Sequence, residues 1–387
     1  MPLVRGEQIA TWGDPNKANG YFGTEEKSRD AIAGDFQDIP IVDISGIFSP
    51  DLKDRQAVAD QVRDACIRVG FFYAKGHGVR SEMMDKTFEW AERFFELSFD
   101  EKMELFINNQ DNYRGYTPMY GSGKPDIDGL ASEYYKQYTS IYHAVMVDWL
   151  TPSDANEAFD WGLDSKLNDD PAYECCDPYM KGSNVWPKQL PGFEEHLSQY
   201  FSKLRDLGRV MSRNIALSLG LDEGSFDPYL THPGCSAVVA HYPPIEPTST
   251  KLGLDPHTDN EFLTFLAPGK VRALEVLNRD GQWISAPPID GMYVVNVGDQ
   301  LQRLTSNLYI STKHRVINHT GEERISVPFF FSANWESIID PLEQLVNDEA
   351  NNESNNVSAG QAYKHTMMAL HMPGDSNPIF QKYLKVA

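Results

Sequence analysis

Cysteine is scarce in this chain. Its 387 residues include only four cysteines, Cys66, Cys175, Cys176 and Cys235. Four thiols are too few for a disulfide framework, and their spacing does not pair them as ligands of a structural zinc site. We therefore expect a reduced, cytoplasmic setting.

Basic residues and long apolar runs are also in short supply. The 34 Lys and Arg face 56 Asp and Glu, which gives a formal net charge of -22 at pH 7. This charge opposes binding to nucleic acid or to an anionic membrane surface, although it does not exclude a small anionic substrate held by a local arginine. The sequence has no apolar run long enough to span a bilayer and no apolar signal core near its start. We expect a soluble protein with a small-molecule substrate and no nucleic-acid or membrane partner.

Hydrophobic periodicity divides the chain into three regions. Residues 1–235 contain helical patterns, the longest of which repeats apolar residues at steps of three, four and seven over Phe193, Leu197, Phe201, Leu204, Met211 and Ile215. Within this region, the Asp-rich stretch 139–183 is interrupted by prolines and is expected to be an irregular insertion of loops and short turns.

Residues 236–335 change to short β-rich runs between Gly, Pro and Asn turns, as in an antiparallel sandwich of about eight strands. Residues 336–387 resemble a polar loop followed by a helix, which either packs as an ordinary helix or closes as a lid. We predict one compact unit of mixed α and β structure, with a double-stranded β-helix (jelly-roll) core flanked by N-terminal helices.

The most informative motif is His257-x-Asp259. Residues i and i+2 of a strand point to the same face, so the imidazole and the carboxylate are directed at one point. His314, in another β-like run, supplies a third ligand. Two histidines and one carboxylate on one face of an ion form the facial triad of non-haem Fe(II) oxygenases, which leaves three positions of the iron open.

A second motif, Arg324-x-Ser326, places a guanidinium and a hydroxyl on one face of a later strand. A planar fork of donors suits a carboxylate held by two parallel charge-assisted hydrogen bonds. The phenol of Tyr242, upstream of the triad, can complete this anion site. Each motif alone occurs by chance in many proteins, and a satisfied polar group is then the simpler interpretation.

Together the motifs occur in the order Tyr242, His257-x-Asp259, His314 and Arg324-x-Ser326. This order resembles the 2-oxoglutarate/Fe(II)-dependent dioxygenase superfamily, in its isopenicillin N synthase-like branch. The resemblance implies Fe(II) at the two histidines and the aspartate, and the far carboxylate of 2-oxoglutarate at Arg324, Ser326 and Tyr242. The co-substrate then chelates two of the open positions of the iron, and O2 takes the third. The implied activity is oxidation of a C–H bond of a small organic substrate, by hydroxylation, desaturation or cyclisation, in amino-acid or secondary metabolism.

Two alternatives remain open. The run from Arg324 to Phe330 resembles isopenicillin N synthase itself, in which the same trio holds a substrate carboxylate and no 2-oxoglutarate is used. The family's usual Asn two residues before the Tyr is Ala240 here, which removes one amide near Tyr242. A different alternative is a catalytically silent ligand-binding module, which has no physical need for an iron triad beside a guanidinium.

Four aromatic residues are candidate substrate contacts. Phe262 follows His257-x-Asp259 and Phe331 follows Arg324-x-Ser326, so alternation along the strands is expected to bring both near the pocket. Tyr116 and Tyr135 come from a Gly- and Tyr-rich stretch, which in the family's layout is a loop over the mouth of the active site. Plain core packing is the competing interpretation for all four. The substrate, the oxidised position and the oligomeric state are not specified by the sequence.

Overall fold

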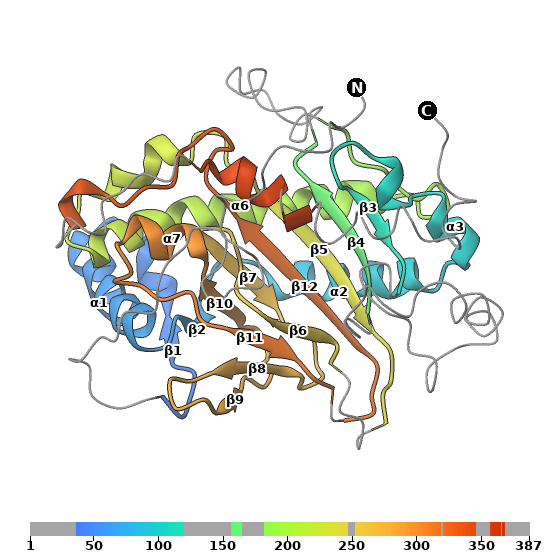
Figure 1. Ribbon diagram of the computed structural model, residues 1–387, viewed down its shortest axis with the longest axis horizontal. Helices are drawn as coiled ribbons and strands as arrows, with labels where there is room; N and C mark the ends of the chain where they lie inside the picture. The colour runs from blue at the N-terminus through green and yellow to red at the C-terminus, as the bar shows by residue number, and fades with distance from the viewer. Residues whose placement is uncertain are drawn as a thin grey trace, which may run out of the picture.

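The computed structural model describes residues 36–119, 156–164, 182–246, 252–318, 320–345, 357–364, 366 and 367. In this part of the chain two β-sheets lie face to face, and helices cover the far side of the larger sheet (Figure 1). The larger sheet has the strand order β1-β2-β10-β7-β12-β5-β4-β3, and the smaller sheet has the order β6-β11-β8-β9.

The larger sheet consists of β1 (Ile41–Asp43), β2 (Phe71–Lys75), β3 (Gly115–Thr117), β4 (Glu157–Gly162), β5 (Ser236–Tyr242), β7 (Leu263–Ala267), β10 (Tyr293–Val297) and β12 (Arg324–Phe331). The smaller sheet consists of β6 (Leu254–His257), β8 (Leu274–Leu277), β9 (Trp283–Ser285) and β11 (His314–Val316). The α-helices are α1 (Leu52–Arg68), α2 (Ser81–Phe95), α3 (Phe99–Met103), α6 (Phe193–Ser218) and α7 (Asp299–Leu304). Short 3-10 helices are η2 (Ile44–Phe48), η3 (Ile107–Asn109), η6 (Glu223–Tyr229) and η7 (Glu343–Leu345).

Strands β5 to β12 form the predicted jelly roll. All eight lie between residues 236 and 331, and they divide equally between the two sheets. The remaining strands extend the larger sheet at both edges, with β1 and β2 beside β10 and with β3 and β4 beside β5. Strands from both sides of residue 236 therefore build this sheet.

Strand β4 corrects the sequence analysis, which expected an irregular insertion over residues 139–183. Residues Glu157–Gly162 pair with β5 along their whole length. Glu and Asp are depleted in strands, so Glu157 and Asp160 conceal the alternation of Phe159 and Trp161. The composition of the stretch therefore concealed a strand that lies next to the edge of the larger sheet.

The larger sheet has two faces of different character. The register of β12 with β5 and with β7 is unbroken, so successive residues of β12 point to opposite sides. On one side, Phe329 packs against Phe201 of α6, with ring centroids 5.0 Å apart. We call this helix-covered side the outer face and the side towards the smaller sheet the inner face. Arg324 and Ser326 lie on the inner face, because they are an odd number of residues from Phe329.

Helices α1, α2 and α6 cover the outer face (Figure 1). All six apolar residues predicted for the stripe of α6 are at most 1% exposed, which confirms that helix as the main support of the sheet. Gly208 permits the close approach, because a β-carbon there would lie 2.3 Å from the ring of Phe331. Any larger residue at this position would push α6 away from β12.

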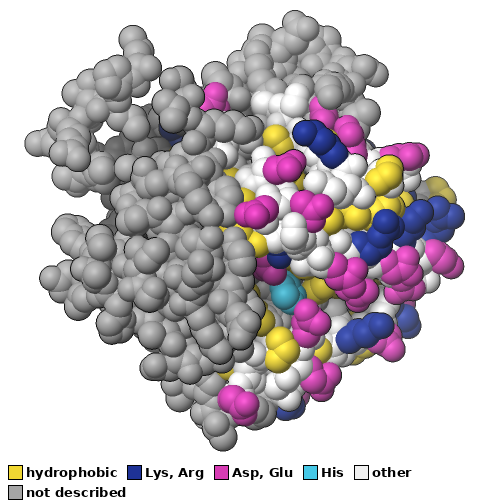
Figure 2. Space-filling model, turned by 90° about the vertical axis from the view of Figure 1, so that its right-hand side faces the viewer, with side chains coloured by type: hydrophobic (Ala, Val, Ile, Leu, Met, Phe, Trp, Pro, Cys, Tyr) yellow, Lys and Arg dark blue, Asp and Glu magenta, His cyan; other side chains and the backbone are white. Residues whose placement is uncertain are grey.

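Acidic side chains are scattered over the described part of the face shown in Figure 2, with basic ones interleaved. This distribution agrees with the overall excess of Asp and Glu in the sequence. Among the described residues, no helix combines the length and the apolar character needed to cross a bilayer.

Candidate functional site

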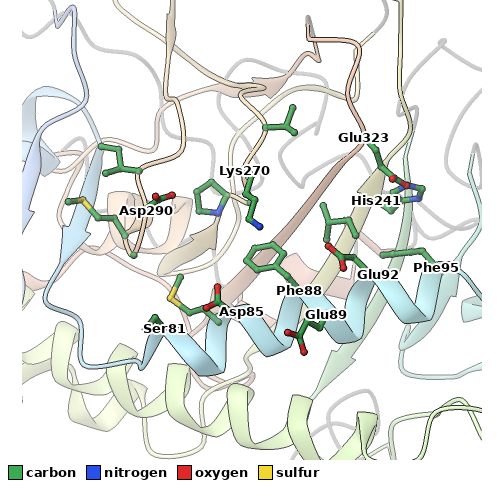
Figure 3. Close-up of a pocket in the computed structure, with 18 of the residues that line it drawn as sticks. Ser81, Asp85, Phe88, Glu89, Glu92, Phe95, His241, Lys270, Asp290 and Glu323 are labelled. Carbon is green, nitrogen blue, oxygen red and sulfur yellow. The ribbon is translucent and has the colours of Figure 1, made fainter.

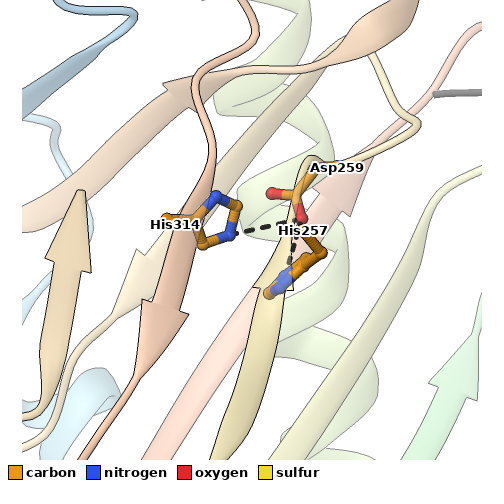
Figure 4. Close-up of side chains that lie close together, drawn as sticks. All are labelled: His257, Asp259 and His314. Atoms are coloured by element: carbon orange, nitrogen blue, oxygen red, sulfur yellow. Dashed lines mark ion pairs between the residues drawn. The ribbon is translucent and has the colours of Figure 1, made fainter. Parts of the chain in front are cut away.

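His257, Asp259 and His314 converge at one point between the two sheets (Figure 4). The two histidines are register partners on the neighbouring strands β6 and β11, and Asp259 lies in the loop that follows β6. Oδ1 of Asp259 is 3.7 Å from Nε2 of His257 and 3.6 Å from Nε2 of His314. Ligands of one octahedral ion with bonds of about 2.1 Å lie about 3 Å apart. The observed spacing is wider, with the three ligand atoms all within 4.8 Å of one another.

Hydrogen bonds hold both imidazoles in the orientation that a metal requires. Nδ1 of His257 lies 2.7 Å from the carbonyl oxygen of Asp255, and Nδ1 of His314 lies 3.2 Å from that of Thr312. A carbonyl only accepts, so each Nδ1 donates its proton there and Nε2 keeps its lone pair. Burial, together with the nearby His257, lowers the pKa of His314 to about 4. His314 is therefore neutral at pH 7, as a metal ligand must be.

Asp259 is held from the side opposite the imidazoles. Its Oδ2 accepts hydrogen bonds from the Thr264 hydroxyl at 2.5 Å and from the Asn296 amide at 2.8 Å. Burial raises the pKa of Asp259, but the imidazoles and these two hydrogen bonds outweigh burial and bring it below its ordinary value. The carboxylate is ionised, and Oδ1 remains free to bind a cation.

The loop after Asp259 is tied to the start of α7. The backbone N–H of Asp299 donates to the carbonyl of Asp259 at 2.8 Å. Gly298 is required there, because a β-carbon would lie 1.9 Å from the carbonyl oxygen of Glu261. Burial, with the charge of Asp259 adding to it, raises the pKa of Glu261 to about 8. The Glu261 carboxyl is therefore mostly neutral at pH 7 and adds little negative charge beside the triad.

The predicted anion site also assembles. Arg324 and Tyr242 are register partners on β12 and β5, and Ser326 follows two residues later on the same inner face. The Arg324 guanidinium lies 4.7 Å from the centre of the Tyr242 ring. Arg324 is only 2% exposed, yet its Nε and Nη1 have no hydrogen-bond partner among the described residues. A buried guanidinium with unused donors is unfavourable without an anion, so these residues fit a bound carboxylate.

Three of the four predicted substrate contacts lie in the core. Phe262 and Phe331 are fully buried, and their ring centroids lie 6.3 Å apart. The ring centroid of Phe262 also lies 5.1 Å from that of Phe226. Phe331 points to the outer face, because it is seven residues from Arg324 and a strand has a period of two. The pocket-facing neighbour of Thr264 is instead Phe330, its register partner. The sequence analysis therefore assigned Phe331 to the wrong face of its strand.

Tyr116 likewise lies on the outer face rather than over the site. It pairs with Phe159 of β4 and is fully buried, and its hydroxyl donates to Glu157 at 2.5 Å. Tyr135 lies outside the described residues. Thr264, Asn296 and Phe330 were missed by the sequence analysis. The polar side chains of Thr264 and Asn296 within otherwise apolar strands were the available signal.

An open groove of about 780 Å³ lies elsewhere, between α2 and the outer face of the larger sheet (Figure 3). Its lining includes the register partners His241 and Ile325 and the acidic side chains of Glu89 and Glu92. His241 and Ile325 lie on the outer face, so the sheet separates this groove from the triad. The groove is therefore distinct from the candidate active site.

Two family models match the chain. The model described as "non-haem dioxygenase in morphine synthesis N-terminal" matches residues 39–189, and that of the "2OG-Fe(II) oxygenase superfamily" matches residues 233–333. The second match contains the triad and the anion site. The chain belongs to the 2OG-Fe(II) oxygenase superfamily. It is an oxidoreductase of the Fe(II)- and 2-oxoglutarate-dependent type, acting on small substrates.

Two curated relatives of this oxygenase are named as an oxidoreductase and a hydroxylase. A 2-oxoglutarate-Fe(II) type oxidoreductase, ppzC, of Metarhizium rileyi is 33% identical over 312 residues, which cover 78% of this chain and 79% of the relative. A homoarginine-6-hydroxylase of Oryza sativa subsp. japonica is 33% identical over 329 residues, covering 81% of this chain and 90% of the relative.

Solved oxygenase structures share the fold. A full-length Neurospora crassa protein, solved in complex with alpha-KG and thymine, superposes with a TM-score of 0.71 at 23% identity and covers 86% of this chain and 96% of its own. JOX2, in complex with 2OG, Fe and JA, gives a TM-score of 0.63 at 25% identity and covers 88% of each chain.

Proposed function

We propose that His257, Asp259 and His314 bind the Fe(II) of this oxygenase and that Arg324, Ser326 and Tyr242 hold the far carboxylate of 2-oxoglutarate. When bound, Fe(II) would activate O2 with electrons from the decarboxylation of 2-oxoglutarate, and this chemistry would oxidise a C–H bond of the substrate. The triad supports this proposal because each ligand atom already has its lone pair directed at the common point. The observation that carries the anion assignment is that Nε and Nη1 of Arg324 are buried and have no hydrogen-bond partner among the described residues.

We further propose that the substrate is a small organic molecule of amino-acid or secondary metabolism. The rice relative is named for hydroxylating homoarginine, and the Neurospora crassa neighbour was solved with thymine. These two compounds are the first to test. A cytoplasmic setting is supported by Cys66 and Cys235, which are buried thiols without a disulfide.

The C-terminal segment, of which residues 357–364, 366 and 367 are described, is proposed to close the site as a lid. Nδ2 of Asn260, the neighbour of Asp259, donates to the Thr366 hydroxyl at 2.5 Å. In the described residues after 356, Tyr363 also packs against Trp335, with ring centroids 5.5 Å apart. These contacts support a position of the segment beside the loop that carries Asp259, where a closing element can exclude water.

Anaerobic titration with Fe(II) and 2-oxoglutarate tests the anion assignment through the weak visible absorption band of the chelate. Arg324→Leu should raise the 2-oxoglutarate concentration for half-saturation at least about 30-fold, because loss of one partner of a buried charge pair costs about 2–5 kcal/mol. Arg324→Lys should recover part of the affinity for 2-oxoglutarate, because the lysine ammonium restores the positive charge but not the two parallel donors of the guanidinium. An unchanged titration in Arg324→Leu contradicts the assignment. Substrate-dependent turnover by the wild-type enzyme with Fe(II) and O2 but no 2-oxoglutarate would favour the oxidase alternative.

A further inference from the structure

The groove between α2 and the outer face has an apolar floor that the protein leaves partly uncovered. Five large apolar side chains of its lining pack against the core and are still partly exposed, namely Phe88, Phe95, Ile289, Met292 and Ile325. Apolar residues that remain at a protein surface are usually scattered singly. A contiguous apolar patch inside a polar rim is instead typical of a surface that another molecule covers.

Acidic side chains form the rim of the groove along α2. Asp85, Glu89, Glu92 and Glu96 follow one another at steps of four, three and four residues, so they lie on one side of the helix. All four are exposed, and none of them forms an ion pair in the part of the chain that the structure describes. At a rise of 1.5 Å per residue the row is about 16 Å long. The rim therefore presents a line of negative charges to solvent.

The wall opposite α2 adds to this charge. Its acids are Asp290 near one end of α2 and Glu323 near the other, with Lys270 between them (Figure 3). Lys270 is the one Lys or Arg in the described lining, and it faces six acids. The groove therefore attracts cationic groups and repels anions such as nucleic acid.

The shape of the groove suits an extended chain. The groove follows α2 from Ser81 to Phe95 (Figure 3), a length of about 22 Å at the helical rise. An extended segment of about six or seven residues spans this length. A helix that is equally long and about 10 Å wide occupies about 1,700 Å³, which is more than the groove volume of about 780 Å³. Alternate side chains of an extended segment point to opposite sides, so one set can cover the floor while Lys or Arg stems reach the rim.

The groove and the candidate active site lie on opposite faces of the same two strands. On β12, Glu323 and Ile325 line the groove, whereas Arg324 between them points to the anion site. On β5, His241 lines the groove, and the next residue, Tyr242, points to the anion site. A segment in the groove therefore leaves the triad and the anion site open.

We propose that the groove is an interaction surface for an extended segment of a partner protein in which basic and apolar residues alternate. The apolar side chains lie on the floor, and the Lys or Arg side chains pair with the acids of α2. A second copy of this chain carries a net charge of -22 and is repelled by the same acids. The inference does not depend on the proposed iron site, since no triad residue lines the groove.

A synthetic peptide tests both requirements. Fluorescence anisotropy measures the binding of a labelled heptapeptide of alternating lysine and leucine at an ionic strength of about 0.15 M, where charges more than about 8 Å apart are screened. Replacing its leucines by serine, or its lysines by glutamate, should weaken binding at least about 10-fold. Glu89→Gln/Glu92→Gln should weaken binding of the lysine-leucine peptide at least about 5-fold. The control Asp60→Asn/Asp64→Asn removes two exposed acids of α1 and should change binding by less than about 1.5-fold.

Further readouts distinguish the groove from other sites and other occupants. Saturation with Fe(II) and 2-oxoglutarate under anaerobic conditions should leave the affinity for the peptide unchanged, and competition would place the peptide in the active site and overturn the proposal. An equal loss of affinity in the two double variants would also overturn it, because overall charge would then explain binding. Sedimentation velocity of the protein alone should show no dimer that Glu89→Gln/Glu92→Gln dissociates. Such a dimer would make a second copy the occupant and overturn the assignment to a partner protein.

Discussion

Strand β4 carries one acid on each face, and the two have opposite environments. On the outer face, Glu157 accepts a hydrogen bond from Lys102 at 2.8 Å and from Tyr116 at 2.5 Å, and it lies 2.8 Å from Nδ1 of His241. On the inner face, Asp160 has no partner in the described part of the chain. Both acids are poorly solvated, so their contrast comes from their partners and not from their depth.

The pKa values of the two acids follow the same contrast. Burial alone would raise the pKa of Glu157, but His241 and the charge of Lys102 bring it below its ordinary value. Burial acts unopposed on Asp160 and raises its pKa to about 8. Arg324, also on the inner face, has two donors without a partner in the part of the chain that the structure describes. The protein therefore supplies partners for Glu157 on the outer face, whereas on the inner face Asp160 and two donors of Arg324 have none among the described residues.

The largest effect is expected on the inner face from removal of an iron ligand. His257→Ala should lower the affinity for Fe(II) by more than about 100-fold, since even loss of an outer partner of a ligand typically costs 10–100-fold. Anaerobic calorimetry measures this directly. His232→Ala, which removes a histidine paired with Glu336 away from the triad, is the matched control. Equal iron affinity in His257→Ala and the control would remove His257 from the site.

The next effect concerns the ion pair on the outer face. Glu157→Ala should lower the free energy of unfolding by about 3–5 kcal/mol, because Lys102 is left buried without its counter-charge. Urea unfolding measures the loss, and Glu89→Ala on α2 should change stability by less than about 0.5 kcal/mol. A loss below about 1 kcal/mol in Glu157→Ala would show that the outer face does not depend on this pair.

The two neighbouring phenylalanines of β12 test the assignment of the faces. Phe331→Ala should cost at least about 3 kcal/mol of unfolding free energy, because its ring fills the space above Gly208 of α6. Phe330→Ala should cost less, since its side chain is only partly buried, and should raise the KM for substrate instead. The reverse pattern, with the larger stability loss in Phe330→Ala, would exchange the two faces.

Motif order and periodicity predicted the framework of the protein. The triad residues come together because β6 and β11 are neighbours, and the stripe of α6 packs as its spacing requires. The stripe of α6 depends on a short-range pattern, whereas the triad was predicted from the order of its motifs, which resembles that of a known family. The sequence also placed Arg324, Ser326 and Tyr242 in one group, which the register of β5 and β12 brings side by side.

The errors arose where a position depends on strand pairing that no motif marked. Strand β4 was missed because its two acids interrupt the apolar alternation, and only pairing with β5 explains them. Phe331 was assigned to the pocket although its odd separation from Arg324 already excluded it. Tyr116 was expected in a loop, and its position on the outer face follows from β3 pairing with β4.

The smallest predicted effect is the pH dependence of stability that Asp160 causes. A carboxyl whose pKa rises from 3.8 to about 8 on folding contributes stability while it is protonated, and this contribution is lost as the pH rises towards 8. Asp160→Asn should therefore equal the wild type in stability near pH 4, gain on it steadily up to pH 8, and stay about 1–3 kcal/mol more stable above. Urea unfolding of both proteins at each pH gives this difference, in which titrations common to both cancel. A difference that stays flat from pH 4 to pH 8 would mean that Asp160 is solvated or paired, and the contrast between the two acids of β4 would disappear.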